Sequence, residues 1–250
     1  MDLELAGRRV VLTGGTRGIG RAIAELFVAE GAGVSFCARD PAQVEATASA
    51  LGAAAHGTTL DVADGAAVRG WVAQAAQAMG GIDIVVSNVS ALAIGDDEAS
   101  WTAGFQTDML GSVRVVDAAM PFLEASGAAS IVIISSVSGR EIDFAAGPYG
   151  AFKAALIHYA QGLAFKLAGK NIRANTVSPG NTYFPGGVWE KIEQGNPKLF
   201  ADAMALNPTG RMGRPEEMAK AVVFLASPAA SFITGANLVV DGALTRGVQF

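Results

Sequence analysis

Short β-branched runs alternate with longer amphipathic stretches along the whole chain, and this alternation limits the fold more than any other feature. The predicted strands are 8–13, 33–38, 56–62, 82–88, 129–136, 172–179 and 236–243. The predicted helices are 18–31, 41–51, 64–79, 98–125 and 147–168, followed by two helical pieces between about 187 and 226, the last opening at Pro215. Such alternation is typical of parallel crossover units with helices on both faces of a sheet. We predict one doubly wound α/β domain over 1–250, with a seven-stranded parallel sheet and an insertion at about 180–213.

Composition excludes several classes of protein. The net charge is −5, and the longest basic run is Arg8-Arg9, which argues against nucleic acid or an anionic membrane as the main partner. Cys37 is the single cysteine, so an intramolecular disulfide is impossible and a reducing compartment is expected. The start "MDLELAGRRVVL" does not resemble a signal peptide, and no apolar run is long enough to span a membrane, so we expect a cytoplasmic protein. His56 and His158 are isolated, so no metal site is predicted.

A glycine-rich turn joins the first predicted strand to the first predicted helix. In "TGGTRGIG" (13–20), Gly14, Gly18 and Gly20 permit a tight turn and let the backbone approach a pyrophosphate. The following helix presents unpaired N–H groups and a favourable dipole to an anion. Turns use glycine for many reasons, but this strand–turn–helix placement favours a dinucleotide-binding loop in a Rossmann-type domain.

The second predicted strand ends in "FCARD", where dinucleotide-binding folds often place an acid on the adenosine ribose. Arg39 and Asp40 lie there, and Arg17 lies in the glycine loop. Two guanidiniums suit a ribose 2′-phosphate, so we expect NADP(H) rather than NAD(H). Alternatively both arginines are solvated, and Asp40 either serves NAD or caps the helix at Pro41. Asp61 either contacts the adenine amino group or caps the next helix.

Three later side chains suit acid–base chemistry on a carbonyl or an alcohol. Tyr149 and Lys153 are one helical turn apart, and Ser136 ends the fifth predicted strand. A free tyrosine has a pKa of about 10, and a neighbouring ammonium stabilises its anion. The serine can hydrogen-bond the substrate oxygen while a cofactor supplies hydride. Taken alone, however, the Tyr-x-x-x-Lys spacing is common by chance.

Taken together, these motifs resemble a short-chain dehydrogenase/reductase of the classical type, over nearly the whole chain. The matching segments are "TGGTRGIG", "SSVSG" with Tyr149 and Lys153, "NTVSPG", "GRMGRPEEMAKAVVFLAS" and "ITGANLVVDGA". The resemblance implies that Tyr149 is the acid/base, that Ser136 positions the substrate oxygen, and that Lys153 stabilises the tyrosinate and binds ribose. The implied cofactor-binding residues are Gly14, Thr16, Arg17, Gly18, Ile19, Gly20, Arg39, Asp61, Val62, Asn88, Tyr149, Lys153, Pro179, Gly180 and Thr182.

Two positions depart from the pattern of that family. The usual "NNAG" after the fourth strand is "SNVS" (87–90), which keeps Asn88 but replaces the glycine by Ser90, so the cofactor is expected to sit slightly differently. The asparagine that usually kinks the long helix is Asp108. Either the aspartate keeps the same polar contacts, or its carboxylate strengthens the Lys153 ammonium while partly cancelling its effect on Tyr149. We include Asp108 among the candidate catalytic residues.

The substrate side is predicted from "VSGREIDFAAGP" and "NTYFPGGVWEKI". The candidate wall residues are Val137, Ser138, Ile142, Phe144, Asn181, Tyr183, Phe184 and Trp189. Most are apolar or aromatic, which favours a hydrophobic or aromatic ketone or alcohol, although Trp189 can equally pack the insertion on the core. Members of the family that act on acyl-carrier-protein substrates carry basic residues near the end of the long helix. Here this segment, "MPFLEASGAAS", has an acid and no basic residue, which weakens a function in fatty-acid synthesis without excluding it.

The main hypothesis is an NADP-dependent ketoreductase acting on a small-molecule carbonyl or alcohol. A dinucleotide-binding sensor with little turnover is the alternative, favoured by Asp108 and "SNVS" but not by the intact Ser136, Tyr149 and Lys153. A lyase on this fold would replace the lysine by arginine. Apolar residues on several faces of helices 98–125 and 147–168 predict a partner subunit. The resemblance implies a homotetramer or homodimer through these helices. The segment "ANLVVDGA" and the apolar terminal "GVQF" are candidates for a second interface.

Overall fold

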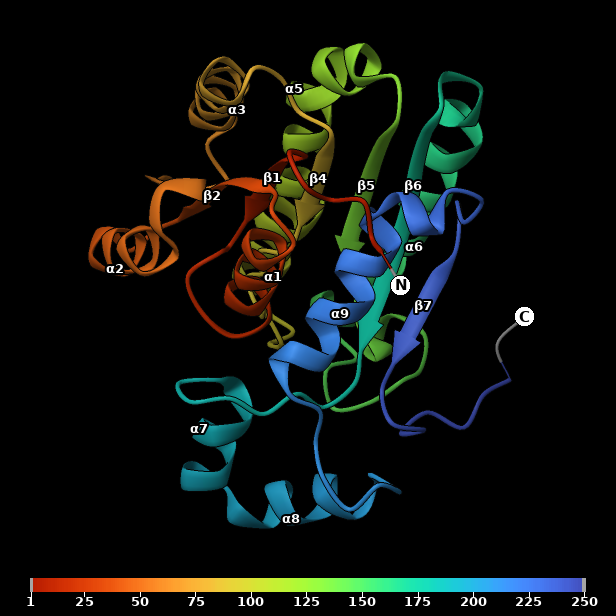
Figure 1. The fold of residues 1–250 in the computed structure, drawn as a ribbon. Coiled ribbons are helices and arrows are strands. Elements are labelled where there is room, and N and C mark those ends of the chain that lie inside the picture. The colour runs from red at the N-terminus through yellow and green to blue at the C-terminus, as the bar shows by residue number, and fades with distance from the viewer. Residues whose placement is uncertain (1, 249–250) are drawn as a thin grey trace.

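The computed structural model describes residues 2–248, and within them seven parallel strands form one sheet (Figure 1). The strands are β1 (Arg9–Thr13), β2 (Gly33–Ala38), β3 (Ala55–Thr59), β4 (Ile84–Ser87), β5 (Ala129–Ile134), β6 (Ile172–Pro179) and β7 (Asn237–Val240). Their order is β3-β2-β1-β4-β5-β6-β7, which confirms the predicted doubly wound α/β fold. The order reverses between β1 and β4, and ligands of such sheets bind beyond the carboxyl ends of the strands at that point. The last two residues of the predicted "GVQF" interface lie outside the described part.

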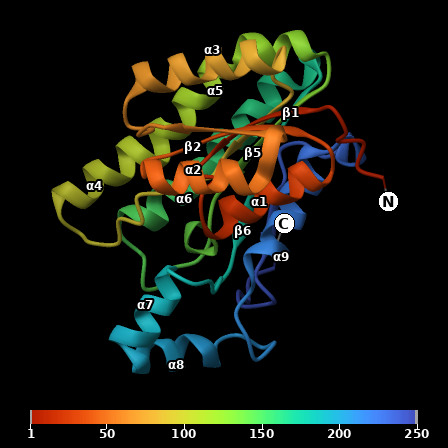
Figure 2. The same cartoon turned by 60° about the vertical axis from the view of Figure 1, so that its left-hand side comes forward.

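Helices cover both faces of the sheet (Figures 1 and 2). One core contains α1 (Gly18–Ala29), α2 (Pro41–Leu51) and α9 (Pro215–Ala226), and the other contains α3 (Gly65–Met79), α5 (Leu110–Ser126) and α6 (Pro148–Leu167). Side chains of β1 pack alternately on the two faces of the sheet: Val10 and Leu12 lie in the first core and Val11 lies in the second. Strands buried on both faces explain the continuous apolar runs. Single 3₁₀ turns lie at Gly52–Ala54, Val137–Gly139, Ala168–Lys170 and Pro228–Ala230.

The helix predicted over 98–125 is interrupted. The structure has α4 (Glu98–Gly104), a wider π-helical turn (Phe105–Met109) and then α5. Inside this turn Asp108 is buried, and Ser112 donates a hydrogen bond from Oγ to its carbonyl oxygen at 2.7 Å. Arg114 donates to the carbonyl of Gln106 at 3.1 Å, which satisfies a carbonyl that a widened turn leaves open. The interruption therefore turns a carboxylate inward at a stabilised break.

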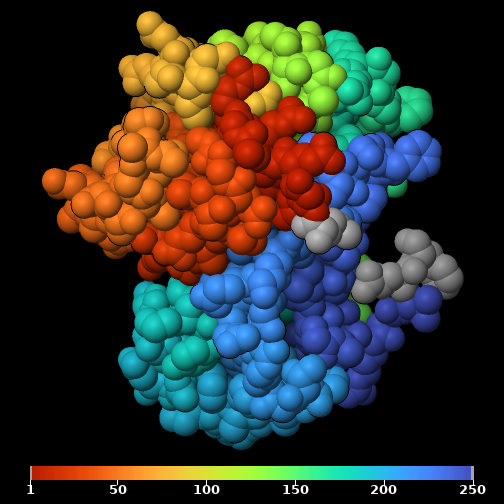
Figure 3. All heavy atoms as spheres, in the orientation of Figure 1, coloured from red at the N-terminus to blue at the C-terminus, as the bar shows by residue number. Residues whose placement is uncertain are grey.

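The insertion between β6 and β7 contains one more helix than predicted. The structure has α7 (Val188–Gly195) and α8 (Pro197–Ala205) before α9. Asn196 separates α7 from α8 because its side chain accepts from the N–H of Leu199 and Pro197 begins the next helix. A bridge between Thr182 and Gly213 closes the base of the insertion. In the space-filling view its cyan and light-blue atoms form the lower part of this face, beneath the red and orange first third of the chain (Figure 3).

The third strand ends earlier than predicted, at Thr59 instead of residue 62. It pairs with β2 only as far as Ala38, which is the last residue of β2. Asp61 and Val62 therefore lie in the turn that follows the strand. Within residues 2–248, no helix has both the length and the apolar character needed to cross a membrane.

Candidate active site

The glycine-rich loop is fixed to the end of β4 by Asn88. The Asn88 amide donates to the carbonyl oxygens of Thr13 at 3.2 Å and Gly14 at 3.0 Å. Gly14 has φ 75°, a backbone conformation that favours glycine, and a Cβ on Gly20 would collide with the Gly14 carbonyl oxygen. Asn88 is therefore a structural anchor for the loop on which the first helix begins.

This loop fits the phosphates of a dinucleotide. The first turn of α1 has no side-chain cap from Arg17, so its N–H groups are available to an anion. Gly18 lies against the ring of Phe184, with which a Cβ at this position would collide. The structure thus places Phe184, a predicted substrate-wall residue, against the predicted phosphate loop.

At the end of β2, the carboxylate of Asp40 is engaged as a helix cap. Asp40 accepts from the backbone N–H of Ala42 at 3.0 Å and of Gln43 at 3.1 Å, and from the Gln43 side-chain amide at 3.1 Å. Arg17 and Arg39 are exposed, and the described part of the chain gives neither an ion-pair partner. The capping interpretation of Asp40 is confirmed, and the local charge beyond it is positive.

Asp61 is not the cap of α3. That position belongs to Asp64, which accepts from the N–H groups of Ala66 and Ala67. The Asp61 carboxylate instead accepts from the N–H of Ala63 at 2.9 Å in the turn after β3. The capping alternative for Asp61 is therefore wrong, and its carboxylate stays at the carboxyl edge of the sheet.

The end of β5 and helix α6 are joined by two hydrogen bonds that surround Lys153. Its Nζ donates to the carbonyl oxygen of Ile134 at 3.0 Å, and the Ser135 hydroxyl donates to the Lys153 carbonyl oxygen at 2.8 Å. The Nζ lies 5.6 Å from the centroid of the Tyr149 ring. Ser136 follows directly after these contacts, so the structure brings the predicted tyrosine and lysine together beside the strand end that carries the serine. Ser135, the tie between strand and helix, was not singled out by sequence reasoning.

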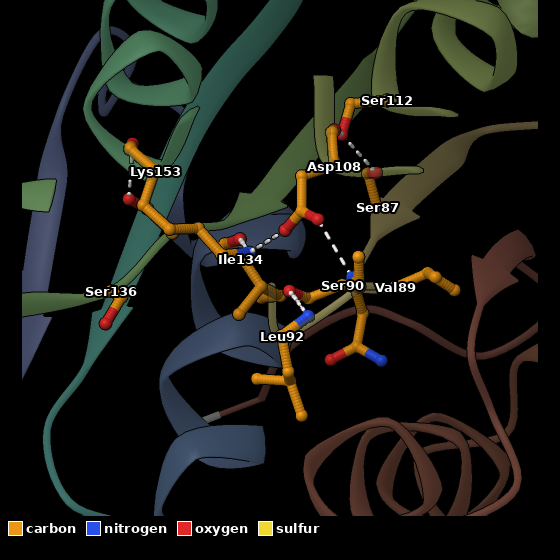
Figure 4. A network of polar contacts seen from close by, with 12 residues as sticks. Ser87, Val89, Ser90, Leu92, Asp108, Ser112, Ile134, Ser136 and Lys153 are labelled. Atoms are coloured by element: carbon orange, nitrogen blue, oxygen red, sulfur yellow. Dashed lines mark hydrogen bonds and ion pairs between the residues drawn. The ribbon is translucent and has the colours of Figure 1, made fainter. Parts of the chain in front are cut away.

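Asp108 forms a buried ion pair with Lys153 (Figure 4). Its Oδ1 lies 3.3 Å from Lys153 Nζ, and the two side chains are only 3% and 2% exposed. Its Oδ2 accepts from the N–H of Ala91 at 2.8 Å, in the segment that follows "SNVS". Ser90, at the usual glycine position, accepts from the N–H of Leu92 at 3.0 Å. The pair compensates the charge of an ammonium that would be costly to bury alone.

A chain of hydrogen bonds continues from Ser136 to an acid that sequence reasoning missed. The Ser136 hydroxyl donates to Ser138 Oγ at 3.3 Å, and the Ser138 hydroxyl donates to Asp143 Oδ2 at 2.6 Å. The N–H of Ser138 donates to Ser136 Oγ at 3.2 Å, and Asp143 Oδ1 accepts from the N–H of Ala145 at 2.8 Å. The one signal for Asp143 in the sequence is that this acid lies between two apolar wall candidates, Ile142 and Phe144.

The predicted wall residues are distributed over several places. Phe144 meets Trp189 in a T-shaped contact with ring centroids 5.6 Å apart. Trp189 is 5% exposed and packs with Ala203 and Met212 in a small cluster inside the insertion, separate from the two main cores, so it does not pack the insertion on the core. The Tyr183 phenol donates to Glu193 at 2.6 Å, and this hydrogen bond raises the pKa of Tyr183 to about 12.

The other candidates divide between exposed and buried positions. Ile142 is 88% exposed and Val137 is buried. The carbonyl oxygen of Asn181 accepts from the N–H of Gly213 at 2.8 Å, and the Thr182 hydroxyl donates to the Gly180 carbonyl oxygen at 3.1 Å.

The remaining cofactor candidates lie along the carboxyl edge. The Thr16 hydroxyl donates to the Gln43 side chain at 3.3 Å, and the N–H of Gly180 donates to the Val240 carbonyl oxygen at 3.0 Å. Ile19 packs on the first core, whereas Val62 and Pro179 are buried. Burial raises the pKa of the Cys37 thiol to about 12, which makes it a poor nucleophile. In the described range, no group of His, Cys, Asp and Glu side chains is arranged to hold a metal ion.

Known proteins with similar sequences and structures are oxidoreductases. A family model described as enoyl-(acyl carrier protein) reductase matches residues 14–245. Isoepoxydon dehydrogenase patN of Penicillium expansum is 40% identical over 254 residues, which cover 98% of each chain. 3-Oxoacyl-[acyl-carrier-protein] reductase FabG of Vibrio harveyi is 32% identical over 248 residues, covering 97% of this chain and 99% of that protein.

Solved structures give the same result. L-Sorbose reductase from Gluconobacter frateurii, complexed with NADPH and L-sorbose, has a TM-score of 0.90 at 27% identity and covers 99% of this chain and 100% of its own. A putative short-chain dehydrogenase/reductase from Burkholderia xenovorans has a TM-score of 0.88 at 34% identity, covering 96% and 97%. The family model and both sets of similar proteins agree with the predicted resemblance. The chain therefore belongs to the short-chain dehydrogenase/reductase family of oxidoreductases, whose members bind a nicotinamide dinucleotide.

Proposed function

We propose that this protein is an NADP(H)-dependent reductase that interconverts a ketone and a secondary alcohol. The observation that carries the proposal is the buried Lys153 ammonium, held by the Ile134 carbonyl and Asp108 and lying beside Tyr149. A buried ammonium next to a phenol stabilises negative charge on the phenol oxygen, which suits a tyrosine that gives up a proton and takes it back.

In the proposed mechanism, each of three side chains has a separate task. The Tyr149 phenol donates a proton to the substrate oxygen during reduction and accepts it during alcohol oxidation. The Ser136 hydroxyl donates a hydrogen bond to the same oxygen and stabilises the negative charge that develops there. Lys153 stabilises the phenolate and holds a ribose hydroxyl. A bound nicotinamide supplies or accepts the hydride.

Asp108 acts in this proposal through Lys153. Because its carboxylate lies 3.3 Å from Nζ, it compensates the charge of the buried ammonium. The same negative charge offsets part of the field that the ammonium exerts at Tyr149. Asp108 is therefore a positioning residue, which acts on Tyr149 through Lys153 without touching the substrate.

The preference for NADP(H) is supported by charge at the end of β2. Asp40 is engaged as the cap of α2, while Arg17 and Arg39 are exposed. A ribose 2′-phosphate would find two guanidiniums and an acid whose oxygens already accept hydrogen bonds. The L-sorbose reductase structure, which contains NADPH, is consistent with this choice.

The first experiment follows oxidation of NADPH and NADH separately with aromatic, aliphatic and cyclic ketones. We expect turnover with both cofactors and a higher kcat/KM with NADPH. Arg39→Ala should raise KM for NADPH by on the order of tenfold or more, because it removes a charge-assisted contact, and leave KM for NADH unchanged.

Arg69→Ala removes an exposed arginine on α3 and serves as the matched control. Equal use of both cofactors, or an Arg39→Ala enzyme that keeps the NADPH preference, would contradict the cofactor assignment. NADPH binding without turnover of any ketone, or of matching alcohols with NADP, would instead favour a dinucleotide sensor.

A further inference from the structure

We propose that Ser138 and Asp143 recognise a hydroxyl group on the carbon next to the substrate carbonyl. The substrates would then be α-hydroxy ketones, and the products vicinal diols. This inference rests on the proposed function and names the substrate class of the same site. The hydrogen-bond donors and acceptors around Ser136 support it.

The proton of Ser138 is already committed. Its hydroxyl donates to Asp143 Oδ2 at 2.6 Å, and the other carboxylate oxygen accepts from the N–H of Ala145 at 2.8 Å. An ionised carboxylate can only accept, so the Ser138 proton stays between the two side chains. Toward its other neighbours Ser138 Oγ is therefore an acceptor, and the Ser136 hydroxyl donates to it at 3.3 Å.

Substrate binding removes that donor. In the proposed mechanism the Ser136 hydroxyl turns to the substrate carbonyl oxygen, which leaves Ser138 Oγ without a donor. The two serines stay close because the N–H of Ser138 donates to Ser136 Oγ at 3.2 Å. Leaving a partly buried acceptor unsatisfied costs free energy, whereas a substrate hydroxyl placed there restores the lost hydrogen bond.

The position of that hydroxyl follows from the spacing of the two serines. One oxygen must accept from Ser136 and the other must donate to Ser138, and the two serine oxygens are 3.3 Å apart. An α-hydroxy ketone carries its two oxygens on adjacent carbons, so one substrate molecule can form hydrogen bonds with both serines. Near the same segment lie the apolar side chains of Val137 and Phe144, which suits an apolar substituent on the rest of the substrate.

A matched pair of ketones tests this inference. α-Hydroxyacetophenone can donate to Ser138, whereas α-methoxyacetophenone has a similar electron-withdrawing oxygen but no proton to donate. We expect native enzyme to reduce the hydroxy ketone with a kcat/KM on the order of tenfold or more above the methoxy ketone. Ser138→Ala should bring this ratio close to one, because the acceptor is gone.

Two further variants separate recognition from general damage. Asp143→Asn should lower the ratio as well, since an amide can donate to Ser138 and release its proton toward an ether oxygen. Ser100→Ala is the matched control, because Ser100 also donates from Oγ to an aspartate, Asp97, at 3.2 Å. It should keep the native ratio. Equal kcat/KM values in the native enzyme, or a ratio that persists in Ser138→Ala, would overturn the inference.

Equilibrium binding distinguishes this inference from the proposed function. Calorimetry measures the Kd of both ketones for native and Ser138→Ala protein saturated with the oxidised cofactor. If the hydroxy ketone binds more tightly than the methoxy ketone, and Ser138→Ala abolishes this difference, the inference is supported even when no ketone is reduced. A lack of reduction would contradict only the proposed function. Equal Kd values for the two ketones, or no binding of either, count against the hydroxyl site directly.

Discussion

At the scale of single residues, the pairing of Asp108 with Lys153 is the feature that most affects the proposed chemistry. A neutral side chain at position 108 would leave the buried ammonium with the Ile134 carbonyl as its polar partner. The carboxylate adds a full compensating charge, 3.3 Å away, in a region where both side chains are almost entirely buried. Charges interact more strongly there than at the surface, so this position is expected to tune Tyr149 through Lys153.

Asp108→Asn tests this coupling. The amide oxygen can still accept from the N–H of Ala91, but the negative charge is lost. The Lys153 ammonium then acts on Tyr149 without an offset, so the pH–rate profile for alcohol oxidation should move to lower pH. Asp117→Asn, at an exposed position of α5, should leave the profile in place. If Asp108→Asn leaves the pH–rate profile unchanged, Asp108 has no role in the proton transfer.

The residues of the candidate site differ in how far the sequence predicts them. Tyr149 and Lys153 are found from their spacing on one helix, since one helical turn places them on the same face. Asp143 is not found this way, because its contact with Ser138 depends on the path of an irregular loop. The position of Phe184 against Gly18 depends on how the insertion folds back on the sheet, which no local pattern encodes.

At the scale of elements, local signals predict boundaries well where a cap or a pairing register sets them. Helix α2 begins at Pro41 and ends at Leu51, and β6 spans Ile172–Pro179, as predicted. The Asp40 cap marks the start of α2, and Pro179 marks the end of β6. Periodicity over 98–125 predicts one continuous helix, because it does not register a break that is stabilised by the tertiary contacts of Asp108. The family resemblance places a kink at position 108, and the π-helical turn lies there.

The end of β5 and the start of α6 act together as one element of the site. Close backbone approach is possible because Gly139 faces α6: a Cβ there would lie 2.7 Å from the N of Ala154. The Ser135 hydrogen bond to the Lys153 carbonyl fixes the same junction. Side chains on regular elements with such contacts are held more rigidly than side chains on free loops, which suits proton transfer.

At the scale of the whole molecule, the sheet order collects the predicted functional residues at one edge. The glycine loop follows β1, Asn88 follows β4, Ser136 follows β5 and Gly180 follows β6. These four strands are parallel and lie next to one another in the order β1-β4-β5-β6, so their carboxyl ends share one edge of the sheet, beginning at the point between β1 and β4 where the strand order reverses. This arrangement was predictable from the alternation of strands and helices together with the position of each motif.

We also propose that the protein assembles as a homodimer or homotetramer through helices α5 and α6. Phe165, on α6, is 90% exposed in the isolated chain, and a partner subunit would cover it. Phe165→Glu should shift the species seen by size-exclusion chromatography with light scattering to a smaller mass. Leu206→Glu, at an exposed position beyond α8, is the control. A native protein that is monomeric, or a Phe165→Glu protein of native mass, would contradict this interface.

Isotope transfer tests the proposal that this protein transfers hydride to its substrate with Tyr149 as the proton donor. The enzyme is given NADPH deuterated at the transferable position together with α-hydroxyacetophenone or an unsubstituted ketone, and the product is analysed by mass spectrometry. We predict an alcohol with one deuterium at the carbinol carbon, formed on the order of 10² to 10⁴ times more slowly by Tyr149→Phe and at the native rate by Tyr159→Phe. Unlabelled product, or a Tyr149→Phe enzyme that forms the alcohol at the native rate, would contradict the proposed mechanism.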